Sequence, residues 1–245
     1  MTEEEWLTAK SPEPMTYFLF TRGSNTRKLR LFACACCRAA WEYLLEDHLR
    51  DAVLAAEACL DGHISPVQMR EHVLTVKRSR KKRDKAVAMV YDTIRDPHHE
   101  LYGHGYGAAD KAARLIASSV APNLSPTAQT FYDGTRWVTE SIPANADRLR
   151  WDEQYTSQHR TFADYLRCIF GNPFRPVAFD PRWRTETVSA LATGIYADRA
   201  FDRLPVLADA LEEAGCDAAD ALAHCRGPGP HARGCWVVDL ALGKE

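Results

Sequence analysis

Metal-ligating side chains are concentrated in two short stretches of this sequence. The stretch LFACACCRAAW places Cys34 and Cys37 three residues apart, which on a helix puts both sulfur atoms on one side. The stretch HCRGPGPHARGC brings further thiols and imidazoles around a turn-rich loop. Zinc in proteins is usually held by four such ligands. The sequence therefore suggests a zinc clip that joins Cys34 and Cys37 to a second pair drawn from Cys225, His231 and Cys235, with His224 beside them.

The first stretch has a second interpretation, a packed core. Between residues 26 and 44, apolar side chains recur at helical spacing over most of the circumference, which is typical of a central helix. Cysteine is small and often fully buried. We therefore expect Cys34, Cys36 and Cys37 to be unreactive core thiols, because a buried thiol without a cationic neighbour stays protonated. Their expected cover is the apolar face of the last helix, with Trp236, Val237, Leu240 and Leu242.

A basic run, VKRSRKKRDK, lies inside a long helix predicted from Val67 to about Arg95. Arg80 and Arg83 stand where the apolar stripe of that helix should continue, so its middle has no core-facing side. Clustered Lys and Arg bind phosphate backbones without reading bases. A solvated helix face, or pairing with acidic parts of the chain, explains the run as well. The candidate nucleic-acid-binding residues are Lys77, Arg78, Arg80, Lys81, Lys82, Arg83 and Lys85.

The stretch DPHHELYGHGYG gathers His98, His99 and His104 in a loop rich in glycine and tyrosine. Histidine is the side chain best suited to acid–base work near neutral pH, and it binds metals. The glycines break the helix that would align zinc-protease ligands, so a surface loop is the alternative. The sequence contains no Walker loop, dinucleotide fingerprint, nucleophile elbow or kinase signature.

The elements that must position these residues are helical nearly throughout. Thr2 with Glu5 predicts a capping box, Ser65 followed by proline predicts a second helix start, and Gly62 predicts a helix end. Asp202 and Asp217 are further expected caps. The fold class is all-α, with N- and C-terminal helices sharing one core. Its expected parts are a helical part at 1–120, a long loop or linker at 121–147 and a helical part at 148–245, which together are expected to form one compact domain.

The composition is that of a soluble globular chain of 245 residues, with 46% hydrophobic and 26% charged residues and a net charge of −2. The acidic N-terminus has no signal-peptide pattern, so we expect a cytoplasmic protein with reduced cysteines and without a membrane partner. Two helices expected near 202–214 and 217–226 resemble a helix-turn-helix, but their acidic side chains would be repelled by phosphate. A packed helical hairpin is the better interpretation.

Three phrases of the sequence are distinctive when taken together. They are MTEEEWL with RKLRLFACACCR, then LRCIFGNPFRPV, and finally HCRGPGPHARGCWVVDLALGK. These phrases resemble a large uncharacterised bacterial protein family that is frequent among planctomycete-type bacteria. The resemblance covers residues 1–60 and 165–245. It implies a helical frame with packed ends around a variable insert, and it implies no activity, cofactor or partner.

Three functional hypotheses follow. The first is a non-enzymatic interaction or regulatory module with a protein partner, because no catalytic motif is found. The second is binding of nucleic acid through the basic run at 77–85. The third is a metal-dependent enzyme that uses the loop with His98, His99 and His104, although the sequence favours a protein that is not an enzyme.

Overall fold

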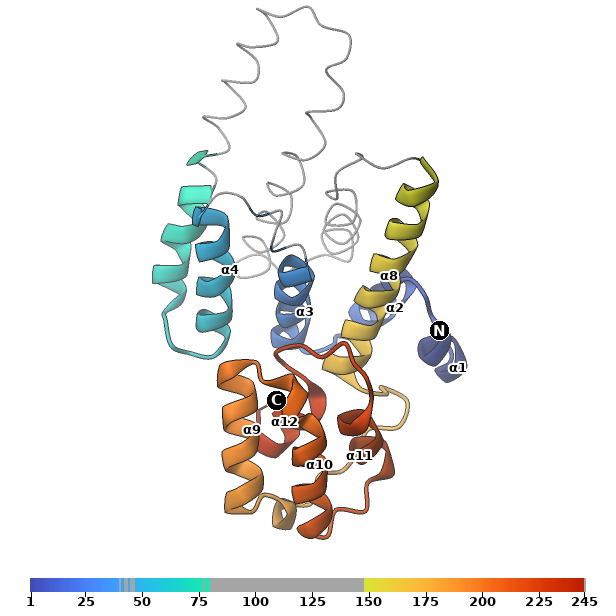
Figure 1. The fold of residues 1–245 in the computed structure, drawn as a ribbon. Coiled ribbons are helices and arrows are strands. Elements are labelled where there is room, and N and C mark those ends of the chain that lie inside the picture. The colour runs from blue at the N-terminus through green and yellow to red at the C-terminus, as the bar shows by residue number, and fades with distance from the viewer. Residues whose placement is uncertain (40, 42–43, 45–46, 77, 80–147, 245) are drawn as a thin grey trace, which may run out of the picture. The chain divides into compact units, whose positions relative to one another are not determined.

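The computed structural model describes residues 1–39, 41, 44, 47–76, 78–79 and 148–244. All regular structure within them is helical, which confirms the all-α fold class. The helices are α1 (Glu3–Thr8), α2 (Pro12–Thr21), α3 (Thr26–Ala39), α4 (Asp47–Leu60), α8 (Arg148–Phe170), α9 (Glu186–Asp198), α10 (Leu204–Glu213), α11 (Ala219–Arg226) and α12 (Trp236–Leu242), with short 3₁₀ turns η2 (Pro181–Trp183) and η3 (Phe201–Arg203) (Figure 1). Residues 66–76 are helical as well.

The chain divides into two compact units, and one of them is discontinuous in sequence. Unit 1 combines Met1–Phe18 with Arg160–Glu245, and unit 2 comprises Leu19–His159. The first helix of the chain and its last helices thus belong to one unit, as expected for ends that share a core. The expected linker at 121–147 lies outside the described residues.

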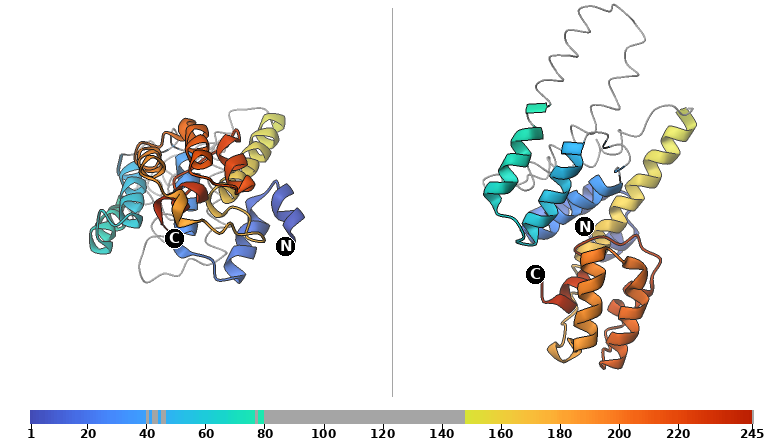
Figure 2. Two further views of the ribbon diagram at one scale, coloured as in Figure 1. Left: turned by 90° about the horizontal axis from the view of Figure 1, so that it is seen from below. Right: turned by 60° about the vertical axis from the view of Figure 1, so that its left-hand side comes forward.

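The core of unit 1 is built by its four C-terminal helices. Helix α9 packs against α10 and α12, while α11 packs against α10 and α12 (Figure 2). In α10, Leu204, Leu207 and Leu211 recur at helical spacing and are fully buried. Arg226, the last residue of α11, pairs with two acids of α10, so the two helices form the expected packed hairpin. The packing of these helices positions the end of α11 and the start of α12, which carry part of the site described below.

The helix starts and stops of this unit were predicted only in part. Thr2 and Glu5 form the predicted capping box of α1. Asp202 and Asp217, in contrast, were wrong as caps. Helix α10 follows directly on the 3₁₀ turn η3, and α11 begins after Ala218, in both cases without a side-chain cap.

In unit 2, α3 packs against α4, and the cysteines of α3 are buried as predicted. Cys34, Cys36 and Cys37 are all at most 2% exposed. Arg38 pairs with the buried Glu57 of α4 at 2.8 Å. The expected cover of these cysteines, α12, packs on α9 and α11 in unit 1, so its contact with α3 remains a prediction.

The helix that follows α4 begins as predicted. Gly62 has a positive φ of 76°, as the end of α4 requires, and Gln68 donates its backbone N–H to the Ser65 hydroxyl at 3.2 Å. Of the described helices, none is long and apolar enough to cross a membrane.

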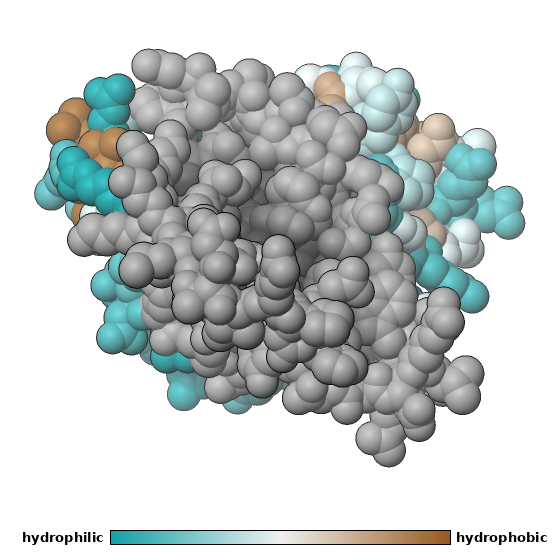
Figure 3. All heavy atoms as spheres, turned by 90° about the horizontal axis from the view of Figure 1, so that it is seen from above, coloured by the Kyte–Doolittle hydropathy of each residue, from teal (hydrophilic) through white to brown (hydrophobic). Residues whose placement is uncertain are grey.

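The described surface shows few large apolar side chains. Where Figure 3 exposes described residues, they are mostly hydrophilic, with apolar groups in small spots. Isolated apolar side chains of this kind are normal on a protein surface. The large ones that are exposed are Leu7, Tyr17, Leu54, Val67 and Val206.

Candidate metal centre

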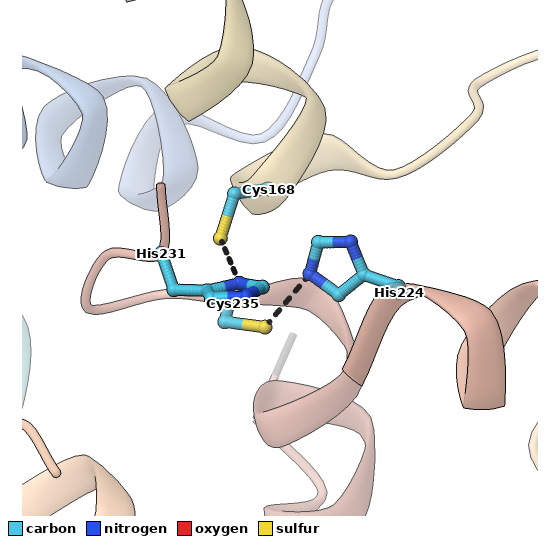
Figure 4. Close-up of side chains that lie close together, drawn as sticks. All are labelled: Cys168, His224, His231 and Cys235. Atoms are coloured by element: carbon cyan, nitrogen blue, oxygen red, sulfur yellow. Dashed lines mark hydrogen bonds between the residues drawn. The ribbon is translucent and has the colours of Figure 1, made fainter. Parts of the chain in front are cut away.

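Two cysteines and two histidines of unit 1 converge on one point (Figure 4). The metal-ligating atoms of Cys168, His224, His231 and Cys235 all lie within 4.8 Å of one another. The two sulfur atoms are buried, and the two imidazoles are partly exposed. Among the described residues, this is the group of three or more His, Cys, Asp or Glu side chains that could hold a metal ion.

Three separate segments deliver these side chains. Cys168 lies in the last turn of α8, and His224 lies in the last turn of α11. His231 comes from the loop between α11 and α12, and Cys235 immediately precedes α12. The centre therefore joins the end of one helix to the end of a second and the start of a third.

Two sulfur–nitrogen distances in the cluster match those around a tetrahedral zinc ion. Cys168 Sγ lies 3.7 Å from His231 Nδ1, and Cys235 Sγ lies 3.3 Å from His224 Nε2. With zinc–sulfur bonds of about 2.3 Å and zinc–nitrogen bonds of about 2.0–2.1 Å, tetrahedral geometry separates a sulfur and a nitrogen ligand by about 3.6 Å. Both pairs lie within a few tenths of an ångström of that separation.

The loop around His231 sets which nitrogen faces the centre. His231 Nε2 lies 3.4 Å from the carbonyl oxygen of Gly227. A carbonyl only accepts hydrogen bonds, so this contact keeps a hydrogen on Nε2 and directs Nδ1 toward Cys168, where Nδ1 would offer its lone pair once a metal replaces its proton. Gly229 has a φ of 81°, and a Cβ there would stand 3.0 Å from His231. Glycine at 229 thus allows the loop to fold tightly over the imidazole.

The electrostatics of the cluster favour a thiolate at Cys235. Burial alone would raise the pKa of Cys235, but hydrogen bonds from Cys168, His224 and His231 bring it well below its ordinary value. Burial, together with the neighbouring Cys235, raises the pKa of Cys168 well above its ordinary value. Burial would also lower the pKa of His231, yet its interaction with Cys235 raises it. One thiolate, the form that binds metals, is therefore already favoured in the protein.

A scan against protein-family models, a search of curated proteins and a search of solved structures each found no match to this chain.

Sequence reasoning identified part of this centre. His231 and Cys235 were predicted ligands, and His224 was noted beside them; all three belong to the cluster. Cys225 does not, because adjacent residues of a helix point about 100° apart. His224 faces the cluster, while Cys225 is 0% exposed in the hydrophobic core of unit 1.

The remaining ligand, Cys168, was missed by sequence reasoning. The only local signal is its position in LRCIFGNP, one turn before a glycine that ends the helix. The predicted ligands Cys34 and Cys37 instead lie in unit 2 and are not members of the group.

The other sequence candidates fall almost entirely outside the described residues. Arg78 is described, and it is helical and exposed. The remaining candidates of the basic run, and all three of the histidine loop, lie outside, namely Lys77, Arg80, Lys81, Lys82, Arg83, Lys85, His98, His99 and His104.

Proposed function

We propose that this chain is a zinc-binding protein whose zinc ion has a structural role in unit 1. The observation that carries the proposal is the convergence of Cys168, His224, His231 and Cys235, with all metal-ligating atoms within 4.8 Å. Two thiolates and two imidazoles in tetrahedral array are a preferred ligand set of zinc.

A structural role fits this ligand set better than a catalytic one. Catalytic zinc keeps one position open for water or substrate, whereas structural zinc is closed by four protein ligands. With four ligands from the chain itself, no position remains for a substrate. For the whole chain we propose a non-enzymatic interaction or regulatory module, with zinc as its cofactor and a protein as its partner.

The bound ion would connect three separate segments of unit 1. Cys168 ends α8, His224 ends α11, and Cys235 begins α12. The loop between α11 and α12 has no helical hydrogen bonds over residues 228–234. A metal that binds only the folded state adds its binding free energy to the stability of the fold.

Metal analysis of the purified full-length chain tests this proposal. The wild-type protein is expected to hold one zinc ion per chain, and Cys168→Ser and Cys235→Ser are expected to abolish binding. Cys225→Ala is the matched control, because the Cys225 thiol is adjacent to His224 in sequence but lies in the hydrophobic core. It should leave the zinc content unchanged. A wild-type chain without zinc after reconstitution, or a Cys225→Ala variant that loses zinc while Cys168→Ser keeps it, overturns the proposal.

A further inference from the structure

The N-terminal helix is held by the same turn of α8 that carries Cys168. Trp6 of α1 is 0% exposed, and its indole Nε1 donates a hydrogen bond to the carbonyl oxygen of Gly171 at 3.0 Å. In return, the Arg167 guanidinium donates to the carbonyl oxygens of Trp6, at 3.1 Å, and of Ala9. Residues 167 and 171, which flank the metal ligand, therefore anchor α1.

Further polar contacts extend this anchor beyond the end of α8. The carboxylate of Glu3 accepts hydrogen bonds from Asn172, at 2.6 Å, and from Arg175. Phe18 stacks on Phe174 with ring centroids 5.0 Å apart. The whole turn after α8 is thus held by residues from the first part of the chain.

The turn after α8 also lies close to the metal centre through the contact of Gly171 with Trp236. Gly171 has a φ of 66°, and a Cβ at this position would stand 3.2 Å from the indole of Trp236. Trp236 directly follows the ligand Cys235, and its ring lies 5.6 Å from the ring of His224. The carbonyl oxygen of Gly171 therefore bonds to Trp6 of α1, while its α-carbon lies close to the indole of Trp236, next to the ligand Cys235.

We propose that α1 acts as a clasp on the metal centre, so that docking of α1 and binding of zinc stabilise each other. This inference rests on the proposed zinc site. When α1 is docked, the end of α8 is already fixed, so Cys168 loses less conformational entropy when it binds the ion. The docked helix therefore raises the affinity for zinc. Coupling of this kind is reciprocal, so zinc must in turn hold α1 in place.

Hydrogen exchange on the wild-type chain provides the first test. Within α1 and its cap, the amide of Trp6 bonds to Thr2 and that of Ala9 bonds to Glu5. Removing zinc with a chelator is expected to speed exchange of the peptide spanning residues 2–9 by at least about fivefold, the lower end of typical coupling. Unchanged exchange in that peptide, while the peptides around Cys168 and Cys235 respond to the chelator, overturns the clasp.

Zinc affinity, measured by competition with a chelating dye, provides the reciprocal test. Trp6→Ala removes the buried indole and is expected to weaken zinc binding by at least about fivefold. Trp6→Phe, which removes only the N–H donor, should give a smaller loss. Glu4→Gln is the matched control on the exposed side of α1 and should bind zinc like the wild type. If Trp6→Ala does not fold, Trp6→Phe and the exchange measurement still decide the question.

The possible results separate this inference from the zinc proposal. A wild-type chain that binds no zinc contradicts the zinc site itself. Equal zinc affinities in the wild type and both Trp6 variants contradict only the clasp. A loss of affinity in Trp6→Ala without any effect of zinc on exchange in α1 also contradicts it, because linkage requires both effects.

Discussion

The two cysteine-rich regions of this protein show opposite chemistry. In α3, three cysteines fall within four residues, yet burial raises the pKa of Cys36 well above its ordinary value, and Cys37 and Cys34 raise it further. In unit 1, Cys168 and Cys235 are far apart in sequence, yet they meet two histidines. There, hydrogen bonds that include those from both histidines counter the effect of burial and bring the pKa of Cys235 well below its ordinary value.

The difference teaches that cysteine density along a chain is a poor indicator of a metal site. On α3, burial and then the buried carboxylate of Glu57 raise the pKa of Cys37, and the described residues hold no group of metal-ligating side chains there. In the centre of unit 1, each sulfur lies beside an imidazole nitrogen. A thiol binds metal where polar partners favour its ionised form, and it serves as a small apolar residue where they do not.

The largest effect that would sharpen this comparison is that of zinc on stability. With free zinc about a thousandfold above its dissociation constant, zinc binding should raise the free energy of unfolding of unit 1 by about 4 kcal/mol. Hydrogen exchange with zinc or with a chelator should show this gain in α9–α12 and a much smaller one in α3 and α4. Equal loss of protection in both regions on chelation would remove the distinction between them.

A substitution within α3 should have a smaller effect, by steric means alone. Cys36 is 0% exposed, so Cys36→Leu should overpack the core and lower the free energy of unfolding by about 1–3 kcal/mol. Cys36→Ala should cost about 1 kcal/mol or less, since it removes only one small group. Chemical denaturation measures both values, and zinc content should be unchanged in both variants. Loss of zinc in either one would mean that the α3 cysteines take part in metal binding.

The last effect to measure is the pH dependence of zinc affinity. The pKa of Cys168 is raised by burial, so below that pKa zinc must displace a proton from its thiol. Burial lowers the pKa of His231, but Cys235 raises it above its ordinary value. A proton therefore competes with zinc for this imidazole at a higher pH than it would at a free histidine. Each displaced proton lowers the apparent affinity about tenfold per pH unit of acidification. Dye competition at several pH values checks this, and an affinity independent of pH would contradict ligation by these groups.

Local signals allowed much of the fold to be predicted from sequence. The capping box of Thr2 with Glu5 and the N-cap Ser65 followed by proline each act within one helical turn, where residue types alone determine the geometry. Asp202 and Asp217 are residue types that suit caps, but the chain enters α10 from a 3₁₀ turn and α11 from Ala218. Neighbouring structure therefore decided those two helix starts.

Only the ligands of the metal centre that lie close together in sequence could be predicted. His231 and Cys235 lie in one turn-rich stretch, so their proximity is visible in the sequence. Cys168 joins them through packing of α8 against a segment distant in sequence, for which no local pattern exists. The choice of His224 over Cys225 depends on how α11 is rotated about its axis, which its packing against α10 and α12 fixes.

X-ray absorption spectroscopy of the zinc-loaded full-length chain tests the central claim most directly. The proposed centre predicts two sulfur neighbours at about 2.3 Å and two nitrogen neighbours at about 2.0–2.1 Å from the ion. Cys168→Ser, which is expected to lose the ion, should not give this two-sulfur spectrum, and Cys225→Ala should give the wild-type one. A first shell of oxygen and nitrogen atoms without sulfur, or a spectrum altered by Cys34→Ala and Cys37→Ala but not by Cys168→Ser, would contradict the assignment of the zinc site to unit 1.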